Sequence, residues 1–364
     1  MMSFITSIGT AVPENRFEQT AIAKFMERII LDETERRKMH AVFRASAINT
    51  RYSVLNDYGK ENDFTFYPNT KGLEPFPSTA KRMQVYREYA CTLSLNAIKK
   101  SIDDAEIRQV THLITVSCTG MYAPGLDIDI VRALSLSTST ERICINFMGC
   151  YAAINALKVA DSICKANVSA KVLIVCTELC SIHFQKDFTE NNILANALFA
   201  DGSAAMLVES RPKDGINYSL EGFHSDIVTS EEQHMAWSIG DLGFEMKLSS
   251  YVPQILQEGI HKLLASLTQK KKIDLDQVHH FAIHPGGKKI LETVGKELNL
   301  KDGKLTASTK VLREYGNMSS PTVIFVLKEI LAGLSAQNNK EYMMGMAFGP
   351  GLTLESVLLQ VHVA

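Results

Sequence analysis

Two short stretches of this chain recur at almost the same separation, which is typical of a fold built from two similar halves. Gln109-Val-Thr-His-Leu113 is echoed 168 residues later by Gln277-Val-His-His-Phe281. Ala156-Leu-Lys158 is echoed 170 residues later by Val326-Leu-Lys328. Because two separate matches agree on nearly one offset, we expect two pseudo-symmetric halves rather than unrelated domains.

We place the first half at residues 1–210 and the second at residues 211–364, joined at the turn-rich segment Arg211–Gly215. Within these halves, apolar β-rich runs alternate with helical patterns. This alternation predicts an α/β protein with buried sheets. The runs read as strands are Val110–Ser117, Arg142–Asn146, Lys171–Cys176 and Ala204–Val208.

The composition excludes several classes of protein. With 46% hydrophobic and 21% charged residues and a formal net charge of −2, the chain lacks the basic surplus of a nucleic-acid-binding protein. It shows neither a basic leader nor a run of about 18 apolar residues, so we expect no membrane span and a cytoplasmic location. Seven cysteines without a CxxC pair indicate free thiols and no zinc or other metal site.

Cys150 follows a strand-like run and a glycine, and it precedes a helical pattern. The polar residues Asn155, Lys158, Ser162 and Lys165 recur there at three- and four-residue spacing, so the rest of the helix is expected to be buried. A cysteine at the N-terminus of such a helix is expected to have a lowered pKa, because the helix dipole stabilises a thiolate.

His284 and Asn317 occupy comparable positions in the second half. An apolar strand delivers His284 into a Pro-Gly-Gly turn, and Asn317 follows Tyr315-Gly316 just before the helical run Thr322–Leu331. The end of a strand is where an α/β fold places its chemistry. A cysteine, a histidine and an asparagine, widely separated in sequence, supply a nucleophile, a base and an amide donor.

The motif string around these residues resembles the chalcone-synthase-like, or type III polyketide synthase, family, in its bacterial form. The matching segments are Gly149-Cys150, His284-Pro-Gly-Gly287, Gly316-Asn-Met-Ser-Ser320 and Phe348-Gly-Pro-Gly351, together with Cys176-Thr-Glu178 and Ala197-Leu-Phe-Ala-Asp-Gly202. The resemblance runs nearly from end to end of the chain.

This resemblance implies a thiolase fold with αβαβα layers, a homodimer, and no metal, flavin or nicotinamide cofactor. The partners it implies are malonyl-CoA and an acyl-CoA starter. Cys150 would accept the acyl group, and His284 and Asn317 would hold the thioester oxygen of malonyl-CoA while carbon dioxide leaves. Donors aimed at a developing oxyanion contribute roughly 2.7 to 4 kcal/mol each in well-studied enzymes.

The resemblance also assigns substrate-binding residues. Phe199 matches the family's gatekeeper between the coenzyme A tunnel and the reaction cavity, and Met246 stands where plant enzymes carry a second aromatic gatekeeper. A flexible thioether there departs from the plant pattern. The glycine-rich segment Gly349, Pro350 and Gly351 belongs to the same set.

Small residues at further pocket positions favour a fatty acyl starter and alkylpyrone or alkylresorcinol products. Thr119, Ala123 and Cys180 are similar to the tunnel residues of long-chain-accepting bacterial relatives. Cys118 resembles relatives that make tetrahydroxynaphthalene from malonyl-CoA alone, which is the alternative product class. For the coenzyme A phosphates the basic candidates are Lys38 and Arg44, with Arg51 as a further substitute.

Other thiolase-fold classes stay open. A ketoacyl-ACP synthase III enzyme shares the Cys, His and Asn set but condenses once, with an acyl carrier protein. The early catalytic glutamate expected of an HMG-CoA synthase is not found, and a partner subunit without catalysis would not need all three residues. The sequence therefore favours a decarboxylating, iterative acyltransferase.

Overall fold

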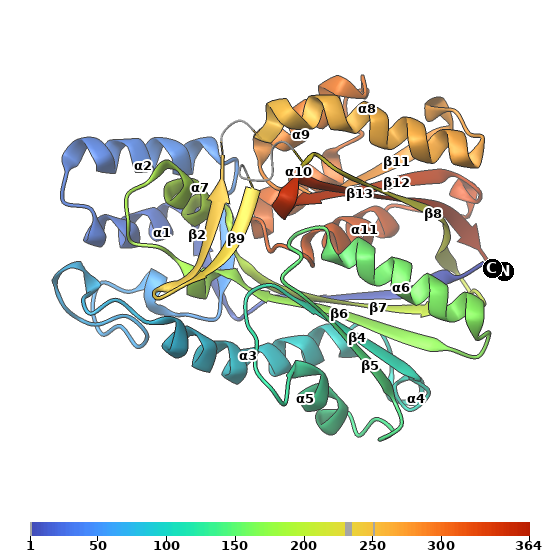
Figure 1. Ribbon diagram of the computed structural model, residues 1–364, viewed down its shortest axis with the longest axis horizontal. Coiled ribbons are helices and arrows are strands. Elements are labelled where there is room, and N and C mark those ends of the chain that lie inside the picture. The colour runs from blue at the N-terminus through green and yellow to red at the C-terminus, as the bar shows by residue number, and fades with distance from the viewer. Residues whose placement is uncertain (1, 230–234, 250–251) are drawn as a thin grey trace.

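The computed structural model describes residues 2–229, 235–249 and 252–364. Its elements form two sheet regions with helices between and outside them (Figure 1). The strands are β1 Phe4–Ala11, β2 Asn15–Glu18, β3 Thr50–Ser53, β4 His112–Ser117, β5 Glu141–Asn146, β6 Lys171–Leu179, β7 Asp201–Glu209, β8 Ile216–Ile227, β9 Met235–Gly240, β10 Gly243–Leu248, β11 Val278–Ile283, β12 Tyr342–Gly349 and β13 Thr353–Val363. The α-helices are α1 Gln19–Met26, α2 Glu33–Ala45, α3 Thr79–Lys99, α4 Asp104–Ile107, α5 Leu126–Ala133, α6 Ala152–Ala166, α7 Glu190–Leu198, α8 Val252–Lys271, α9 Lys288–Glu297, α10 Thr306–Tyr315 and α11 Thr322–Ala332.

Nine strands are hydrogen-bonded in the order β11-β12-β13-β8-β1-β7-β6-β4-β5. The pairing of β1 with β8, in the middle of this strand order, is short, because only Phe4–Ser219 and Ile5–Tyr218 are partners. The two ends of the series therefore diverge into two layers. Helices α6 and α11 lie between these layers, α3 and α5 cover one outer face, and α8 and α9 cover the other (Figure 1). The predicted αβαβα order is confirmed.

The two halves of the chain repeat one topology. In the first half β4 and β6 are parallel neighbours and β7 is antiparallel to β6. In the second half β11 and β12 are parallel neighbours and β13 is antiparallel to β12. Helices α6 and α11 occupy corresponding places between the first two strands of each set. The division at residue 210 itself stays a prediction.

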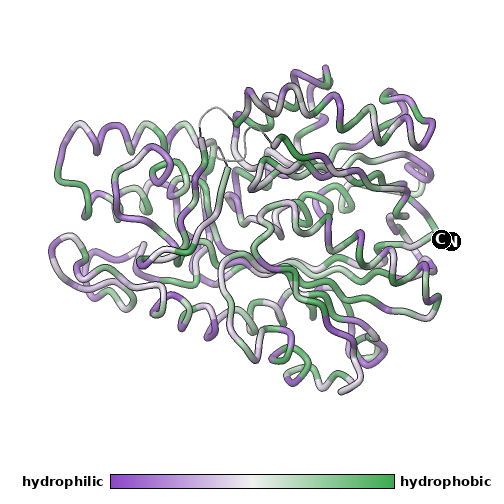
Figure 2. Tube along the Cα trace, in the orientation of Figure 1, coloured by the Kyte–Doolittle hydropathy of each residue, from purple (hydrophilic) through white to green (hydrophobic). Residues whose placement is uncertain are grey.

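The four predicted strand runs are found as β4, β5, β6 and β7, and the predicted helix after Asn317 is α11. Hydrophobic residues follow the strands and the enclosed helices, whereas hydrophilic residues recur along the outer helices (Figure 2). The expectation that every strand is buried is wrong for β5. This strand pairs only with β4, and most of its residues are exposed because it forms the edge of the sheet.

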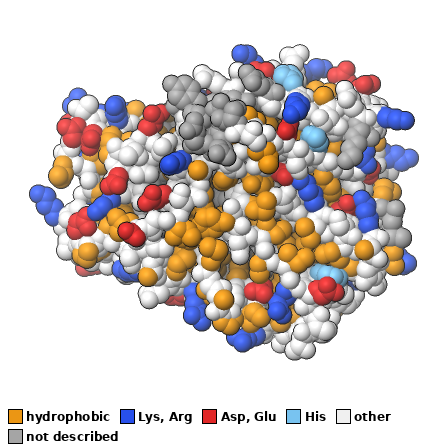
Figure 3. All heavy atoms as spheres, viewed as in Figure 1, with side chains coloured by type: hydrophobic (Ala, Val, Ile, Leu, Met, Phe, Trp, Pro, Cys, Tyr) orange, Lys and Arg blue, Asp and Glu red, His pale blue; other side chains and the backbone are white. Residues whose placement is uncertain are grey.

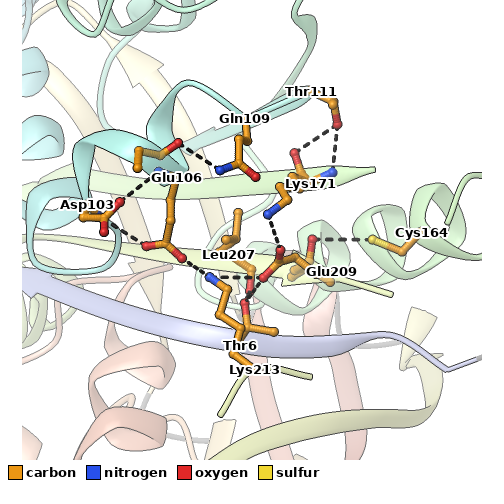
Figure 4. A network of polar contacts seen from close by, with 12 residues as sticks. Thr6, Asp103, Glu106, Gln109, Thr111, Cys164, Lys171, Leu207, Glu209 and Lys213 are labelled. Carbon is orange, nitrogen blue, oxygen red and sulfur yellow. Dashed lines mark hydrogen bonds and ion pairs between the residues drawn. The ribbon is translucent and has the colours of Figure 1, made fainter. Parts of the chain in front are cut away.

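A network of hydrogen bonds and ion pairs joins β1, β6 and β7 at the C-terminal end of β7. Glu209 accepts hydrogen bonds from Thr6 Oγ1 at 2.5 Å and from Lys171 Nζ at 2.9 Å, and it pairs with Lys213 at 3.2 Å (Figure 4). Lys213 also pairs with Glu106 just after α4 begins. Among the described helices, none combines the length and apolar character needed to cross a bilayer.

Candidate active site

Cys150 lies between β5 and α6, two residues before α6 begins, and only 6% of its surface is exposed. Its neighbour Gly149 has φ of +89°, a conformation that favours glycine. A Cβ atom at Gly149 would lie 2.2 Å from Pro350 Cδ, so the loop of Gly349, Pro350 and Gly351 can close over the cysteine only because residue 149 has no side chain.

Cys118 stabilises this turn through hydrogen bonds. Its sulfur accepts a hydrogen bond from Gly149 N at 2.9 Å, and its carbonyl accepts one from Trp237 Nε1 at 2.7 Å. Burial, with a further contribution from the Glu178 charge, raises the pKa of the Cys118 thiol well above its ordinary value. Cys118 is therefore a protonated structural support of the Cys150 backbone, and it lines the cavity rather than carrying a thiolate.

Asn317 faces the Cys150 sulfur. Its Oδ1 lies 4.0 Å from Cys150 Sγ and accepts a hydrogen bond from Ser319 N at 2.8 Å. The Ser319 N–H can only donate, so it fixes which end of the amide is oxygen. Nδ2 donates to Gly286 O at 3.3 Å, which uses one of its two hydrogens. The second hydrogen is the amide donor predicted from the sequence.

His284 follows β11 directly, as predicted, and its backbone N–H donates to Met346 O at 2.8 Å. The side chain is 1% exposed, and neither ring nitrogen has a hydrogen-bond partner within the described part of the chain. A Cβ at Gly286 would lie 3.7 Å from His284 Nε2. Because Asn317 contacts both Gly286 and Cys150, the three predicted residues gather at one place.

Burial controls the charge of this group. It raises the pKa of Cys150 to about 12 and lowers the pKa of His284 to about 3, since a buried site disfavours either charged form. The prediction that the helix terminus lowers the thiol pKa is therefore not confirmed. A buried neutral imidazole with a free nitrogen is, however, suited to accept the thiol proton when the sulfur attacks.

Glu178 was noticed in the sequence only as part of a motif, yet it is fully buried beneath the site. Its carboxylate accepts hydrogen bonds from Thr119 Oγ1 at 2.7 Å, Cys118 N at 2.8 Å and Ser320 Oγ at 2.7 Å. Burial raises the pKa of Glu178 to about 7 despite these donors. This negative charge adds to the burial effect on the Cys150 pKa.

A narrow cavity of about 10 Å³ adjoins Cys150, which is room for roughly one water molecule. Its wall includes Thr119 and Cys180 as predicted. Four of its residues also line a second chamber of about 40 Å³, so the two spaces are contiguous. The shared residues are Cys180, Phe199, Trp237 and Met246. The two gatekeeper positions thus stand at the junction of the chambers.

His183 forms part of the second chamber and was not predicted. It donates from Nε2 to Thr119 O at 2.7 Å, and Phe244 N donates to its Nδ1 at 2.9 Å. The ring stacks on Phe244 at 4.2 Å with an interplanar angle of 8°. Burial lowers the pKa of His183 to about 3, so it is a neutral, rigid wall. Only proximity to the Cys176–Glu178 motif could have drawn attention to it.

Ala123 does not join Thr119 and Cys180. It lines a separate cavity of about 220 Å³ together with Tyr86, Gly120 and Cys144. Gly120 packs closely on Tyr86 in the wall of this cavity, since a Cβ at residue 120 would lie 2.0 Å from the Tyr86 ring. The three predicted tunnel residues therefore border two spaces rather than one.

The predicted coenzyme A residues lie on or near α2. Lys38 and Arg44 are exposed, and Lys38 shares a helix face with Val42 and Ala45, which line an apolar cavity of about 250 Å³. The opposite wall includes Gly286, Gly287 and two lysines that the sequence reasoning missed, Lys288 and Lys289. Arg51 is buried instead, which is incompatible with the earlier suggestion that it binds a phosphate.

The five-layered fold, with a buried thiol, an imidazole and an amide at the point where its halves meet, defines a thiol-dependent condensing enzyme of the thiolase class. Comparison with known families gives the same result. Residues 2–212 match the N-terminal domain, and residues 220–362 the C-terminal domain, of the chalcone and stilbene synthases. The chain belongs to this family.

Relatives cover the chain from end to end. It is 31% identical over 98% of its length to "Probable polyketide synthase 1" of Dictyostelium discoideum, although it spans only 11% of that protein. It is 28% identical over 99% of its length to the "Alpha-pyrone synthesis polyketide synthase-like Pks18" of Mycobacterium tuberculosis and spans 91% of that protein.

Solved structures agree. The C-terminal type III polyketide synthase domain of Steely1 from Dictyostelium superimposes with a TM-score of 0.90 and 28% identity over the whole of both chains. PKS-I from the brown alga Ectocarpus siliculosus gives a TM-score of 0.90 and 28% identity over 99% of this chain and 98% of that one. The chain is a type III polyketide synthase, a decarboxylating condensing acyltransferase of a family that uses malonyl-CoA and acyl-CoA substrates.

Proposed function

We propose that Cys150 carries the growing chain as a thioester and that His284 and Asn317 activate malonyl-CoA. The thiol passes its proton to His284 as the sulfur attacks the starter thioester, and the departing coenzyme A thiolate takes that proton. Malonyl-CoA then loses carbon dioxide, and the electron pair moves onto its thioester oxygen. The resulting enolate carbon attacks the Cys150 thioester, which leaves the extended chain on coenzyme A and frees the Cys150 thiolate. For the next cycle that thiolate attacks the new thioester, takes the chain back and releases coenzyme A.

The observation that carries this proposal is the state of the donors beside Cys150. His284 is buried with both ring nitrogens unpaired within the described residues, and Asn317 keeps one N–H unused. Unpaired buried polar groups are costly unless they act on a ligand. Two donors at one place are suited to an oxygen that becomes negative, and decarboxylation creates such an oxygen without any base.

The apolar cavity between α2 and α9 is the proposed site of the pantetheine arm. It borders Gly286, whose carbonyl contacts Asn317, so an arm lying there points its thioester at the catalytic group. The exposed Lys289 on α9 lines the cavity and the exposed Lys38 lies one turn before Val42 on α2, so both suit the phosphates of coenzyme A. Arg44 is a weaker candidate, because it does not share the helix face of Lys38, Val42 and Ala45. The reaction as written needs no metal and no prosthetic group.

For the starter and product we propose a fatty acyl-CoA and alkylpyrone- or alkylresorcinol-type products. The similarity to a relative named for alpha-pyrone synthesis supports a lactone product. The cavity beside Cys150 holds only about one water molecule, so an extended chain must displace a wall residue. Met246 is the flexible candidate, because it lies between the cavity at Cys150 and the 40 Å³ chamber, which is the space into which the starter tail would extend.

We also propose that the enzyme is a homodimer joined at β5. Hydrophobic side chains gather on the face that carries α5 and α6 (Figure 3). On or near the β5 edge, Met121 is 42% and Ile143 is 37% exposed. An unprotected edge strand with exposed apolar residues is prone to pair with another chain, and a second copy would cover it.

The test is mass spectrometry of the products formed by purified enzyme from malonyl-CoA, with and without starters from acetyl-CoA to palmitoyl-CoA. Alkylated pyrones or resorcinols that require the starter and vanish in Cys150→Ala support the proposal. A naphthalene product from malonyl-CoA alone would instead identify the enzyme as a tetrahydroxynaphthalene synthase. A single condensation that needs an acyl carrier protein contradicts the iterative reaction.

A further inference from the structure

The gatekeeper Phe199 and the amide Asn317 come from different halves of the chain but share a backbone junction. Asn317 N donates to Leu198 O at 2.9 Å, and Ala200 N donates to Asn317 O at 2.9 Å. Leu198 is the last residue of α7 and residues 199–200 follow it, whereas residue 317 lies between α10 and α11. The relative position of the amide and the gate therefore depends on where the C-terminal end of α7 is held.

That end is capped by two buried side chains rather than by water. Arg51 Nη1 donates to Asn196 O at 2.8 Å and to Phe199 O at 2.6 Å, and Gln19 Nε2 donates to Ala197 O at 2.8 Å. Together with the Asn317 N–H on Leu198 O, these bonds satisfy each carbonyl from residue 196 to residue 199. The last four carbonyl groups of an α-helix have no hydrogen-bond partner within the helix itself.

Arg51 is fixed from its other side as well. Its Nε donates to Gln19 Oε1 at 2.8 Å, and its guanidinium lies 5.6 Å from the centre of the Phe43 ring. The side chain also packs on Gly316, where a Cβ would come within 2.9 Å of Arg51 Cγ and Cδ. Arg51 thus touches the residues immediately before Asn317 and the backbone of Phe199 at the same time.

This arrangement is costly. Arg51 is 4% exposed, burial lowers its pKa to about 10, and its Nη2 has no hydrogen-bond partner among residues 2–229, 235–249 and 252–364. The side chain still carries its charge at neutral pH. A positive charge at the C-terminal end of a helix is favourable, and the planar fork of arginine reaches two carbonyls that one lysine ammonium cannot hold equally well.

We propose that Arg51 is a positioning residue that sets the placement of the Asn317 amide and the Phe199 gate, and so the rate of malonyl-CoA decarboxylation. Its side chain also borders the 40 Å³ chamber, but it acts through the backbone junction. This inference rests on the proposed function, because it assumes that Asn317 serves the decarboxylation step.

The test compares Arg51→Lys with wild type in three assays: release of acetyl-CoA from malonyl-CoA, alkylation of Cys150 by iodoacetamide, and thermal unfolding. We expect acetyl-CoA release to fall at least about 10-fold through kcat, since misplacing a catalytic group by about an ångström costs on that order or more. Alkylation should be unchanged, because the thiol is held by Gly149 and Cys118. Gln19→Met should act in the same direction with a smaller loss.

Two controls separate positioning from general destabilisation. Glu209→Gln weakens the distant network of Figure 4, so it should lower the melting temperature without lowering kcat. The double variant Arg51→Lys/Asn317→Ala should lose no more activity than Asn317→Ala, since both changes remove one function. Losses that multiply, or an unchanged kcat in Arg51→Lys, would overturn the proposal. Wild-type enzyme that releases no acetyl-CoA would instead refute the proposed function.

Discussion

The side-chain oxygen of Asn317 lies 4.0 Å from the Cys150 sulfur, while the nitrogen of the same amide donates to Gly286 two residues after His284. One amide therefore connects Cys150 of the first half with the histidine turn of the second. Its orientation is set by the Ser319 N–H, so neither substrate nor water is needed to aim it. The group is preorganised for a negatively charged oxygen.

Replacing His284 by Gln should slow alkylation of Cys150 at pH 7 by at least about 10-fold and move the alkylation profile to higher pH. Burial holds the thiol protonated, so the reaction depends on the imidazole as proton acceptor. The measurement is the rate of iodoacetamide incorporation at pH values from 6 to 10, in steps of about one pH unit. Superimposable profiles for the two proteins would mean that His284 does not receive the proton.

Glu178→Gln should make the protein more stable than wild type at pH 8 but not at pH 4. Burial raises the pKa of Glu178 from 4.5 to about 7. Because the folded state binds this proton more tightly than the unfolded state, the wild type loses stability as the pH rises from 4.5 to 7. The loss is on the order of 3 kcal/mol.

Thermal unfolding of both proteins across that range measures the difference. The glutamine fits the same donors, because its oxygen can accept from Cys118 N while its amide faces the rotatable hydroxyl of Ser320. Other titrating groups are common to both proteins and cancel. Parallel stability curves would show that Glu178 does not titrate in this window.

Ile143→Arg should convert the enzyme to a monomer if β5 joins two copies. A charge on the exposed edge strand cannot be buried in a pairing of two sheets without a large desolvation cost. Light scattering after size-exclusion chromatography gives the mass directly. Val168→Arg is the matched control, since Val168 is 50% exposed in the turn after α6 and away from β5. A dimer in both variants would place the interface elsewhere.

Met246→Phe should shift the products toward shorter chains. Met246 stands between the two chambers with Phe199 and Trp237, so a rigid ring there reduces the space into which the chain extends. The ratio of short to long products by mass spectrometry should rise several-fold. Ile239→Phe, an exposed position on the neighbouring strand β9, should leave the ratio unchanged. Equal shifts in both variants would indicate that an altered β9–β10 hairpin, and not a smaller chamber, changes the products.

The three candidate residues could be found from the sequence because each lies at the end of a predicted element and beside a glycine, a local pattern visible in the chain. In the structure Cys150 lies just before α6, His284 follows β11, and Asn317 lies between α10 and α11. The internal echoes predicted the repeated topology for the same reason. Local patterns also gave the bounds of β4 to β7 closely.

Properties that depend on distance through space were not predictable. The Cys150 pKa depends on burial, which opposes the helix terminus that the sequence made visible. His183 reaches Thr119 and Phe244 from segments 64 and 61 residues away, and no local pattern marks it. Ala123 was assigned by alignment, which does not show that it borders a different cavity from Thr119 and Cys180. Edge exposure of β5 follows from strand order, which alternation of residues does not give.

The most direct test of the account is to find where the acyl group is attached. Wild-type enzyme is incubated with an acyl-CoA starter without malonyl-CoA, digested, and mapped by peptide mass spectrometry. We expect one acyl adduct on the peptide that contains Cys150, none in Cys150→Ala, and an unchanged adduct in Asn317→Ala, since that residue serves the later step. An adduct on Cys118, or none on Cys150, would contradict the central claim.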